Sequence, residues 1–267
     1  MSIGNAQTTA PVNRTWLAAG LLVTVLAMVA GGVTACEAIT DSGPGQSAQQ
    51  GQTYQHKTSR VEIDLGAGDI TLSPGSADQV VVDRRLRWKH TRPTTHEDWD
   101  GSTLRVSAVC PDQDNCSVNY TLQVPANVTV QAHTAAGNLS IRDVTGALDL
   151  RNESGNVKVY NPQAQVRIQG TSGDITGSGL RSTDVQVQTN SGDITLGFNT
   201  SPNAAKATTQ SGTVRITVPR AGSGADGYHV QAATNAGQRQ VQVQEDSAGQ
   251  HSIVASADAG DVIVQYA

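Results

Sequence analysis

The chain has 267 residues, a formal net charge of −5, only 3% aromatic residues with a single phenylalanine, and 27 glycines. This composition suits a thin all-β stack better than a globular domain with a bulky core. The mild acidity argues against a nucleic-acid partner, because no basic field covers the chain.

Residues 1–35 are predicted to be a lipoprotein-type signal peptide. Arg14 supplies a positive charge, and the stretch from Trp16 to Ala35 carries none, which is the layout of an export segment. The stretch ends in Val-Thr-Ala-Cys, which resembles the bacterial lipobox. This resemblance implies that Cys36 receives a lipid. An uncharged stretch of this length can also span a bilayer, so an uncleaved single-pass anchor is the alternative, followed by ordinary secretion.

Residues 36–53 are expected to form a flexible tether that lifts the folded part away from the membrane. Gly, Ser, Gln and Pro are frequent in this segment, and its apolar positions show no period. Strand-like alternation begins at Tyr54 and continues to the end of the sequence. Residues 54–267 are therefore expected to form one β-strand-repeat domain.

An early predicted strand carries a row of basic residues. Arg85, Arg87 and Lys89 fall on one of its faces, and Leu86 and Trp88 fall on the other. We interpret the basic row as a solvated outer face whose long stems cover apolar surface. A ridge that binds polyanions is the alternative.

The loop expected at residues 90–100 gathers side chains that could bind a metal. They are His90, His96, Glu97, Asp98 and Asp100. Their spacing matches no zinc finger and no facial triad. We therefore expect a mobile, charged hairpin loop and no metal.

Two of the three cysteines are expected to form a disulfide. Cys110 and Cys116 enclose a polar turn between two strand-like segments, and such a pair forms in an oxidising compartment. This pairing leaves Cys36 as the odd cysteine, which the lipobox explains.

One short phrase recurs through the chain and predicts its fold. Its copies include SGNVKV, SGDITG and SGDITL, and from Gly137 to Gly212 their glycines recur every 18 to 20 residues. A fixed period of about this length is typical of stacked repeats. The pattern of each copy predicts two short strands with alternating aliphatic residues and a corner between them. A single copy buries too little to fold alone, so we predict an all-β, β-solenoid stack of two-strand coils of about 18–20 residues.

The repeat turn has a structural explanation. Glycine supplies backbone angles that a side chain would forbid, while Ser, Asp and Asn can bond to nearby amides. The residues assigned to this turn are Gly68, Asp69, Gly137, Gly155, Gly173, Asp174, Gly192, Asp193, Gly212, Gly260 and Asp261. Calcium binding is the alternative for the aspartates, but the sequence lacks the glycine-dense nonapeptide of calcium-binding rolls. We expect no cofactor.

Together with the lipobox, the Cys-x5-Cys turn, the VPANVTV corner and the SGDI phrases make residues 55–267 resemble a family of exported bacterial β-strand-repeat proteins. That family is catalogued as adhesin-like and of unknown function. The resemblance implies the architecture, and it provides no catalytic residues to carry over.

The expected function is a non-catalytic adhesion or interaction module, lipid-anchored at the outer face of the bacterial cell membrane. Its ligand would be an extracellular protein or a glycan. A structural or sensory component of an envelope system is the alternative. An enzyme acting on polysaccharides comes third, because such sites need paired carboxylates and sugar-stacking aromatics, whereas the acids here are scattered over turns.

Overall fold

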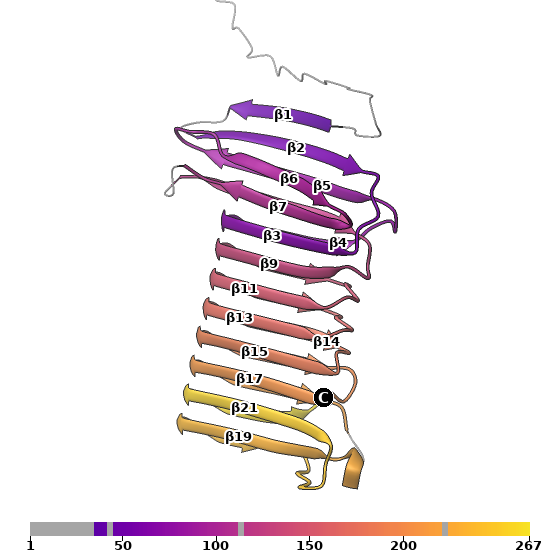
Figure 1. Ribbon diagram of the computed structural model, residues 1–267. Helices are drawn as coiled ribbons and strands as arrows, with labels where there is room; N and C mark the ends of the chain where they lie inside the picture. Colours follow the sequence, from indigo (N-terminus) through magenta and orange to yellow (C-terminus); the bar gives the residue numbers. More distant parts are fainter. Residues whose placement is uncertain (1–34, 42–44, 112–114, 221–223) are drawn as a thin grey trace, which may run out of the picture.

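The structure is a computed structural model that describes residues 35–41, 45–111, 115–220 and 224–267. Their strands form a 12-stranded sheet, called sheet A, and a 10-stranded sheet, called sheet B. The coils are piled one on another along a single axis (Figure 1). Each coil gives one strand to each sheet. The predicted β-solenoid with two strands per coil is therefore confirmed.

The order of the strands in space defines the stack. Sheet A contains β1 (Ala35–Asp41), β2 (Gln46–Tyr54), β5 (Val80–Trp88), β8 (Ser117–Val124), β4 (Ile70–Pro74), β10 (Leu139–Arg142), β12 (Val157–Tyr160), β14 (Ile175–Leu180), β16 (Ile194–Phe198), β18 (Val214–Val218), β22 (Val262–Tyr266) and β20 (Arg239–Val241). Sheet B contains β6 (Thr94–Asp100), β7 (Thr103–Val109), β3 (Arg60–Ala67), β9 (Thr129–Ala136), β11 (Leu148–Ser154), β13 (Val166–Ser172), β15 (Asp184–Ser191), β17 (Ala204–Ser211), β21 (His251–Ala259) and β19 (Tyr228–Ala236). A short 3-10 helix, η1 (Gly224–Asp226), precedes β19.

Two kinds of strand pairing divide the stack. Neighbouring strands are parallel from β8 to β20 in sheet A and from β7 to β19 in sheet B. At the N-terminal end the pairing is antiparallel, between β1 and β2, β2 and β5, β5 and β8, and β6 and β7. The N-terminal end is therefore a cap of hairpin-like strands on a parallel solenoid.

The coils do not follow the chain order at either end of the stack. The coil of β3 and β4 lies between the coil of β7 and β8 and that of β9 and β10. At the other end, the last coil of the chain, β21 and β22, lies between the β17/β18 coil and the β19/β20 coil. The inner coil is also the more apolar one, because Ile253, Val262 and Val264 are fully buried in it. The more polar β19/β20 coil is left at the end of the stack.

Alternation along each strand directs the aliphatic residues into the space between the sheets. In one middle coil, Leu148, Leu150, Val157 and Val159 are at most 2% exposed. Parallel pairing in register stacks them on the corresponding residues of the next coil. Burial of aliphatic side chains of this size stabilises by about 1.5–3 kcal/mol each, and the core formed in this way is continuous along the stack.

The repeat turns stack a column of glycines at positions where no other residue type would fit. Gly155 and Gly173 have φ angles of +124° and +122°. A Cβ on Gly155 would lie 2.2 Å from the carbonyl oxygen of Gly137, and one on Gly173 would lie 2.1 Å from that of Gly155. The column continues with Gly68, Gly192, Gly212, Gly260 and Gly237. Positive φ and the close approach of neighbouring backbones therefore require glycine at this turn.

The flexible tether expected at residues 36–53 is not what the structure shows for most of that segment. β1 and β2 lie there, and β2 pairs over its whole length with β5, from Gln46 opposite Trp88 to Tyr54 opposite Val80. Backbone hydrogen bonds to β5 stabilise a strand whose Gln-rich sequence has no apolar alternation. Ala48 is its one buried apolar residue.

The expectation of a mobile loop at residues 90–100 is also wrong for most of that segment. Residues 94–100 form β6, which pairs antiparallel with β7 from Thr94 opposite Val109 to Asp100 opposite Thr103. The sequence there is polar because β6 is the outermost strand of sheet B, where charged residues prevent further strand pairing.

Candidate functional site

The aspartates of the repeat turns bond to the neighbouring coils. Asp174 Oδ1 accepts a hydrogen bond from the Asp193 amide at 2.9 Å. The Asp174 amide in turn donates to Asn156 Oδ1, also at 2.9 Å. The other turn carboxylates accept from backbone amides in the same way: Asp193 from Thr213 (2.7 Å), Asp69 from Asn138 (2.8 Å) and Asp261 from Gln238 (2.9 Å). This geometry is the corner ladder that turn chemistry predicts.

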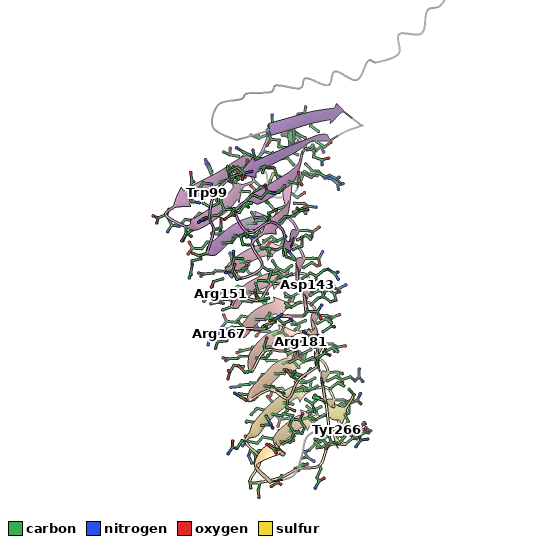
Figure 2. The ribbon with its side chains drawn as sticks, turned by 90° about the vertical axis from the view of Figure 1, so that its right-hand side faces the viewer. Trp99, Asp143, Arg151, Arg167, Arg181 and Tyr266 are labelled. Atoms are coloured by element: carbon green, nitrogen blue, oxygen red, sulfur yellow. A yellow bond between two sulfur atoms is a disulfide. The ribbon has the colours of Figure 1, made fainter. Side chains whose placement is uncertain are left out.

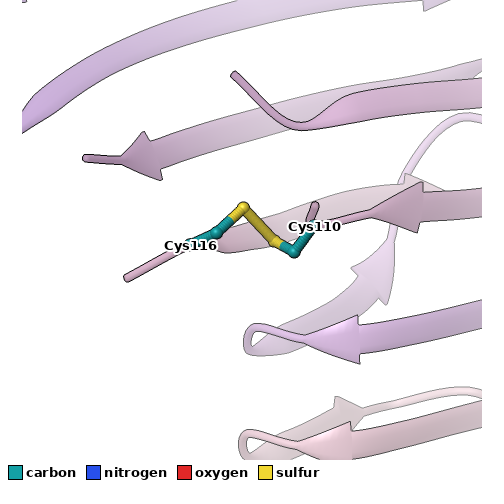
Figure 3. Close-up of a disulfide and its surroundings, with 2 residues drawn as sticks. All are labelled: Cys110 and Cys116. Carbon is teal, nitrogen blue, oxygen red and sulfur yellow. A yellow bond between two sulfur atoms is a disulfide. The ribbon is translucent and has the colours of Figure 1, made fainter. Parts of the chain in front are cut away.

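The structure joins Cys110 and Cys116 in a disulfide with a Cα–Cα distance of 5.6 Å (Figure 3). The bond closes the turn that leads from β7 in sheet B to β8 in sheet A. It therefore ties the two sheets together close to the N-terminal cap.

Cys36, the residue expected to be lipidated, lies in β1 opposite Gly51 of β2. Residues 1–34 of the predicted signal peptide lie outside the described part of the chain. Within the described part, no helix has the length and apolar character needed to cross a membrane.

The basic strand has the two faces that its sequence predicts. Arg85, Arg87 and Lys89 are exposed on the outer side of sheet A, whereas Leu86 and Trp88 are buried between the sheets.

Sequence reasoning missed a buried ionic network at the same place. Arg84 is in phase with Leu86, so its side chain enters the space between the sheets, where it forms an ion pair with Glu97 of β6. Arg84 Nε also donates to Gln50 Oε1 at 2.7 Å, and the Tyr120 hydroxyl donates to Glu97 Oε1 at 2.9 Å. The alternation of β5 was the signal that could have revealed Arg84.

The candidate metal ligands of residues 90–100 do not converge. Along β6, Glu97 faces the core, while His96, Asp98 and Asp100 belong to the opposite, outer face. Among the residues that the structure describes, no three His, Cys, Asp or Glu side chains are grouped as metal ligands.

A polar surface lies on the outer face of sheet B near the N-terminal cap. A hollow of about 560 Å³ there spans five strands, namely β6, β7, β3, β9 and β11. Its charged and amide lining consists of Glu62, Asp64, Asp98, Arg105, Gln131, His133 and Arg151. Further along the stack, Arg151 and Arg167 extend on the same side of the molecule (Figure 2). The lining residues of the hollow and Arg167 come from neighbouring strands in register. We call the outer surface of sheet B that they form the sheet B face.

Opposite charges alternate across the strands of the sheet B face. Glu62 bonds to Arg60 Nε at 2.6 Å and to Arg105 Nε at 3.1 Å. Arg105 also pairs with Asp100 at 3.0 Å. The hydrogen bonds from Arg60 and then Arg105 hold the pKa of Glu62 below its usual range. Glu62 therefore bonds to both of its arginine neighbours as a carboxylate.

A histidine connects the next column of the sheet B face. His133 Nδ1 lies 2.9 Å from Asp64 Oδ1, and its Nε2 lies 3.6 Å from Glu153 Oε1. All three side chains are substantially exposed. This arrangement offers hydrogen-bond donors and acceptors to a polar ligand.

The fold and the surface define a β-strand-repeat protein that presents broad outer faces. The chain belongs to the Toastrack DUF4097 family, whose model matches residues 58–265. No curated protein matches it.

Three solved structures resemble the chain at low identity. A candidate adhesin from Bacteroides fragilis NCTC 9343 is 12% identical with a TM-score of 0.41, covering 82% of this chain and 97% of its own. A candidate cell adhesion protein from Clostridium sporogenes ATCC 15579 is 8% identical with a TM-score of 0.34, covering 88% and 100%. A candidate adhesin from Parabacteroides distasonis ATCC 8503 is 11% identical with a TM-score of 0.32, covering 82% and 97%.

Proposed function

We propose that the protein is a non-catalytic adhesion or interaction module of the cell envelope, and that it contacts an extracellular protein or glycan through the sheet B face. The observation that carries this proposal is the hollow of about 560 Å³, whose charged and amide side chains come from strands in fixed register. A rigid sheet holds such groups in place before a ligand arrives, which lowers the entropy cost of binding.

The chemistry of the sheet B face suits a polar ligand. Its ion pairs leave carboxylate, guanidinium, amide and imidazole groups at the surface in an alternating pattern. Such a pattern matches hydroxyl groups of a glycan or a mixed-charge protein surface better than a large apolar ligand.

The same geometry supports a binding role over catalysis. A general acid needs a carboxyl group whose pKa is raised towards neutral pH. The Glu62 carboxyl has its pKa lowered instead, because Arg60 and Arg105 donate hydrogen bonds to it. Glu62 and Asp100 pair with arginines, whereas a glycosidase pairs two carboxyl groups across the scissile bond.

Anchoring through residues 1–35 and Cys36 completes the proposal. β1 is the outermost strand of sheet A, so a lipid on Cys36 places this end of the stack at the membrane. Twelve strands at about 4.8 Å spacing then extend the stack about 50 Å outward. The sheet B face is exposed to the extracellular side in this arrangement.

Binding of bacteria that display the full chain tests the proposal. The probes are a glycan array, isolated cell-wall polysaccharide and cultured host cells. Replacing Glu62, His133 and Arg151 by Gln should abolish binding, whereas the matched outer-face variant of sheet A, Lys158→Gln with Arg215→Gln, should bind normally. Equal binding by both variants, or no binding to any probe, would refute the adhesion function. The anchor has its own test, because Cys36→Ser should remove the chain from the membrane fraction and abolish palmitate labelling.

A further inference from the structure

We propose that the outer face of β5 is a docking surface for anionic phospholipid headgroups, formed by Arg85, Arg87 and Lys89 beside the membrane-proximal edge of sheet A. This inference rests on the membrane anchoring proposed above. It assigns a second contact to the protein, distinct from the sheet B face, that fixes how the stack stands on the bilayer.

Arg85 and Arg87 of β5 form a row with Lys89, the residue that follows the strand, and the cross-strand partners of the two arginines are uncharged. Alternate residues of a strand are about 7 Å apart on one face. Arg85 lies between Gln49 of β2 and Asn119 of β8. Arg87 lies between Ser47 and Ser117 on the same two strands. On the outer face of β5 the acidic residue is Asp83, at the far end of the row from Lys89. Asp69 and Asp83 line a hollow together with Arg85, so among the described residues the positive charge of the row is strongest at Arg87 and Lys89.

Basic residues at the same end of sheet B, by contrast, form ion pairs with carboxylates. Arg60 and Arg105 both pair with Glu62, and Arg105 also pairs with Asp100. Like charges in a row repel each other, and sheets ordinarily offset them with opposite charges on the neighbouring strand. Among the described residues, the strand partners of Arg85 and Arg87 supply no opposite charge, and a row of basic residues of this kind attracts anions.

A hollow beside the row can receive a headgroup. It has a volume of about 490 Å³, and its lining includes Arg87, Lys89, Gln46 and Asn115. At its base, the Trp88 indole donates to Gln46 Oε1 at 2.7 Å, which orients the Gln46 amide. Guanidinium, ammonium and amide groups are donors to phosphate oxygens, and charge-assisted bonds of this kind are strong.

The place of the row in the stack identifies a membrane as its partner. β5 is separated by β2 alone from β1, the strand that contains Cys36. Two strand spacings amount to about 10 Å. The field of an anionic bilayer extends over a Debye length of about 8–10 Å at physiological ionic strength. Basic residues so close to an anchor are attracted to acidic lipids.

Acylation footprinting of the full chain tests the inference. The chain is reconstituted in vesicles of phosphatidylcholine alone or with 30% phosphatidylglycerol, and lysines are acetylated with sulfo-NHS-acetate and quantified by mass spectrometry. Phosphatidylglycerol should slow acetylation of Lys89 about three- to tenfold relative to Lys158, which lies further along the same face of sheet A and serves as the internal control. Salt at 1 M should remove the difference.

Variants distinguish the effect of Arg85 and Arg87 from a general effect of the positive charge of the protein. Arg85→Gln with Arg87→Gln should abolish the protection of Lys89, whereas Arg151→Gln with Arg167→Gln on sheet B should leave it unchanged. Equal Lys89 rates in both vesicles overturn the inference, and so does protection by soluble polyphosphate without protection by phosphatidylglycerol. If the chain does not remain bound to either kind of vesicle, the proposed lipid anchor is refuted. Loss of ligand binding by the sheet B face would not affect the protection of Lys89.

Discussion

Arg84 on β5 and Glu97 on β6 form an ion pair that connects the two sheets at the N-terminal end of the stack. Their side chains are 14% and 6% exposed. Hydrogen bonds from the Tyr120 hydroxyl to Glu97 and from Arg84 to Gln50 extend the network to β8 and β2. In the middle coils aliphatic contacts hold the sheets together, and at the cap a charged network adds to such contacts.

Removing one member of this pair should be costly. Glu97→Ala or Arg84→Met alone leaves an uncompensated charge in a buried place, so we expect the free energy of unfolding to fall by about 3–5 kcal/mol. The double variant Arg84→Met with Glu97→Leu should lie within about 1 kcal/mol of the original chain, because it leaves no charge behind. Urea unfolding followed by circular dichroism measures both. Single variants no more harmful than Arg105→Gln, which breaks two exposed ion pairs, would contradict the buried role.

Alkaline pH should weaken the same cap. Burial raises the pKa of Tyr54 to about 12, and the negative charge of Glu97 adds to the effect. The unfolded chain then loses this proton near pH 10, before the folded chain does, so the free energy of unfolding is unaffected below about pH 10 and falls as the pH rises towards 12. Urea midpoints at pH 8, 10 and 11 should show a shallower decline for Tyr54→Phe. Identical declines would contradict this assignment.

The middle of the stack could be predicted from its sequence because every constraint there is local. Val157 and Val159 alternate with polar residues, and the glycine of the turn requires a positive φ. The ends could not be predicted in the same way. The coils from β3/β4 to β19/β20 share one glycine column, so the turn glycine does not specify which coil is adjacent to which.

The candidate site shows the same division between local and long-range information. The inward phase of Arg84 follows from alternation within β5, but its partner Glu97 lies on the opposite sheet. The pair between Glu62 and Arg105 depends on β3 lying beside β7, which is a consequence of the coil order at the N-terminal end. β2 and β6 are stabilised mainly by pairing with β5 and β7, and their own sequences carry little strand signal.

The glycine column should tolerate no side chain. In Gly173→Ala, the new Cβ would lie 2.1 Å from the carbonyl oxygen of Gly155, at a φ of +122°. Overpacking and the unfavourable φ together should lower the free energy of unfolding by about 3 kcal/mol or more. Gly66→Ala is the matched control, because a Cβ there meets nothing within 4 Å. Chemical denaturation of the two variants side by side would show equal stability if the close approach were absent.

The aspartate ladder should depend on hydrogen bonding and be independent of metal. Asp174→Ala removes the acceptor of the Asp193 amide and should cost about 1 kcal/mol, whereas Asp174→Asn keeps an acceptor oxygen and should cost less. Because these oxygens already accept bonds from amides, EDTA or millimolar calcium should leave the melting temperature unchanged. A calcium-dependent rise in melting temperature that Asp174→Ala abolishes would instead establish a metal site.

Arg239 should prevent the β19/β20 coil, which lies at the end of the stack, from pairing with other chains. Its Nε donates to the Ala232 carbonyl of β19 at 3.0 Å, and its guanidinium pairs with Glu245 at 2.9 Å, so the side chain lies across the last coil. The pair is about half exposed, so Arg239→Ala should cost at most about 1 kcal/mol. It would nevertheless uncover an edge strand, and exposed edges associate. Sedimentation velocity of the detergent-solubilised chain should therefore show oligomers for Arg239→Ala and none for Arg215→Ala, an exposed arginine on the outer face of sheet A. Equal sedimentation of the two variants would show that other groups protect this end.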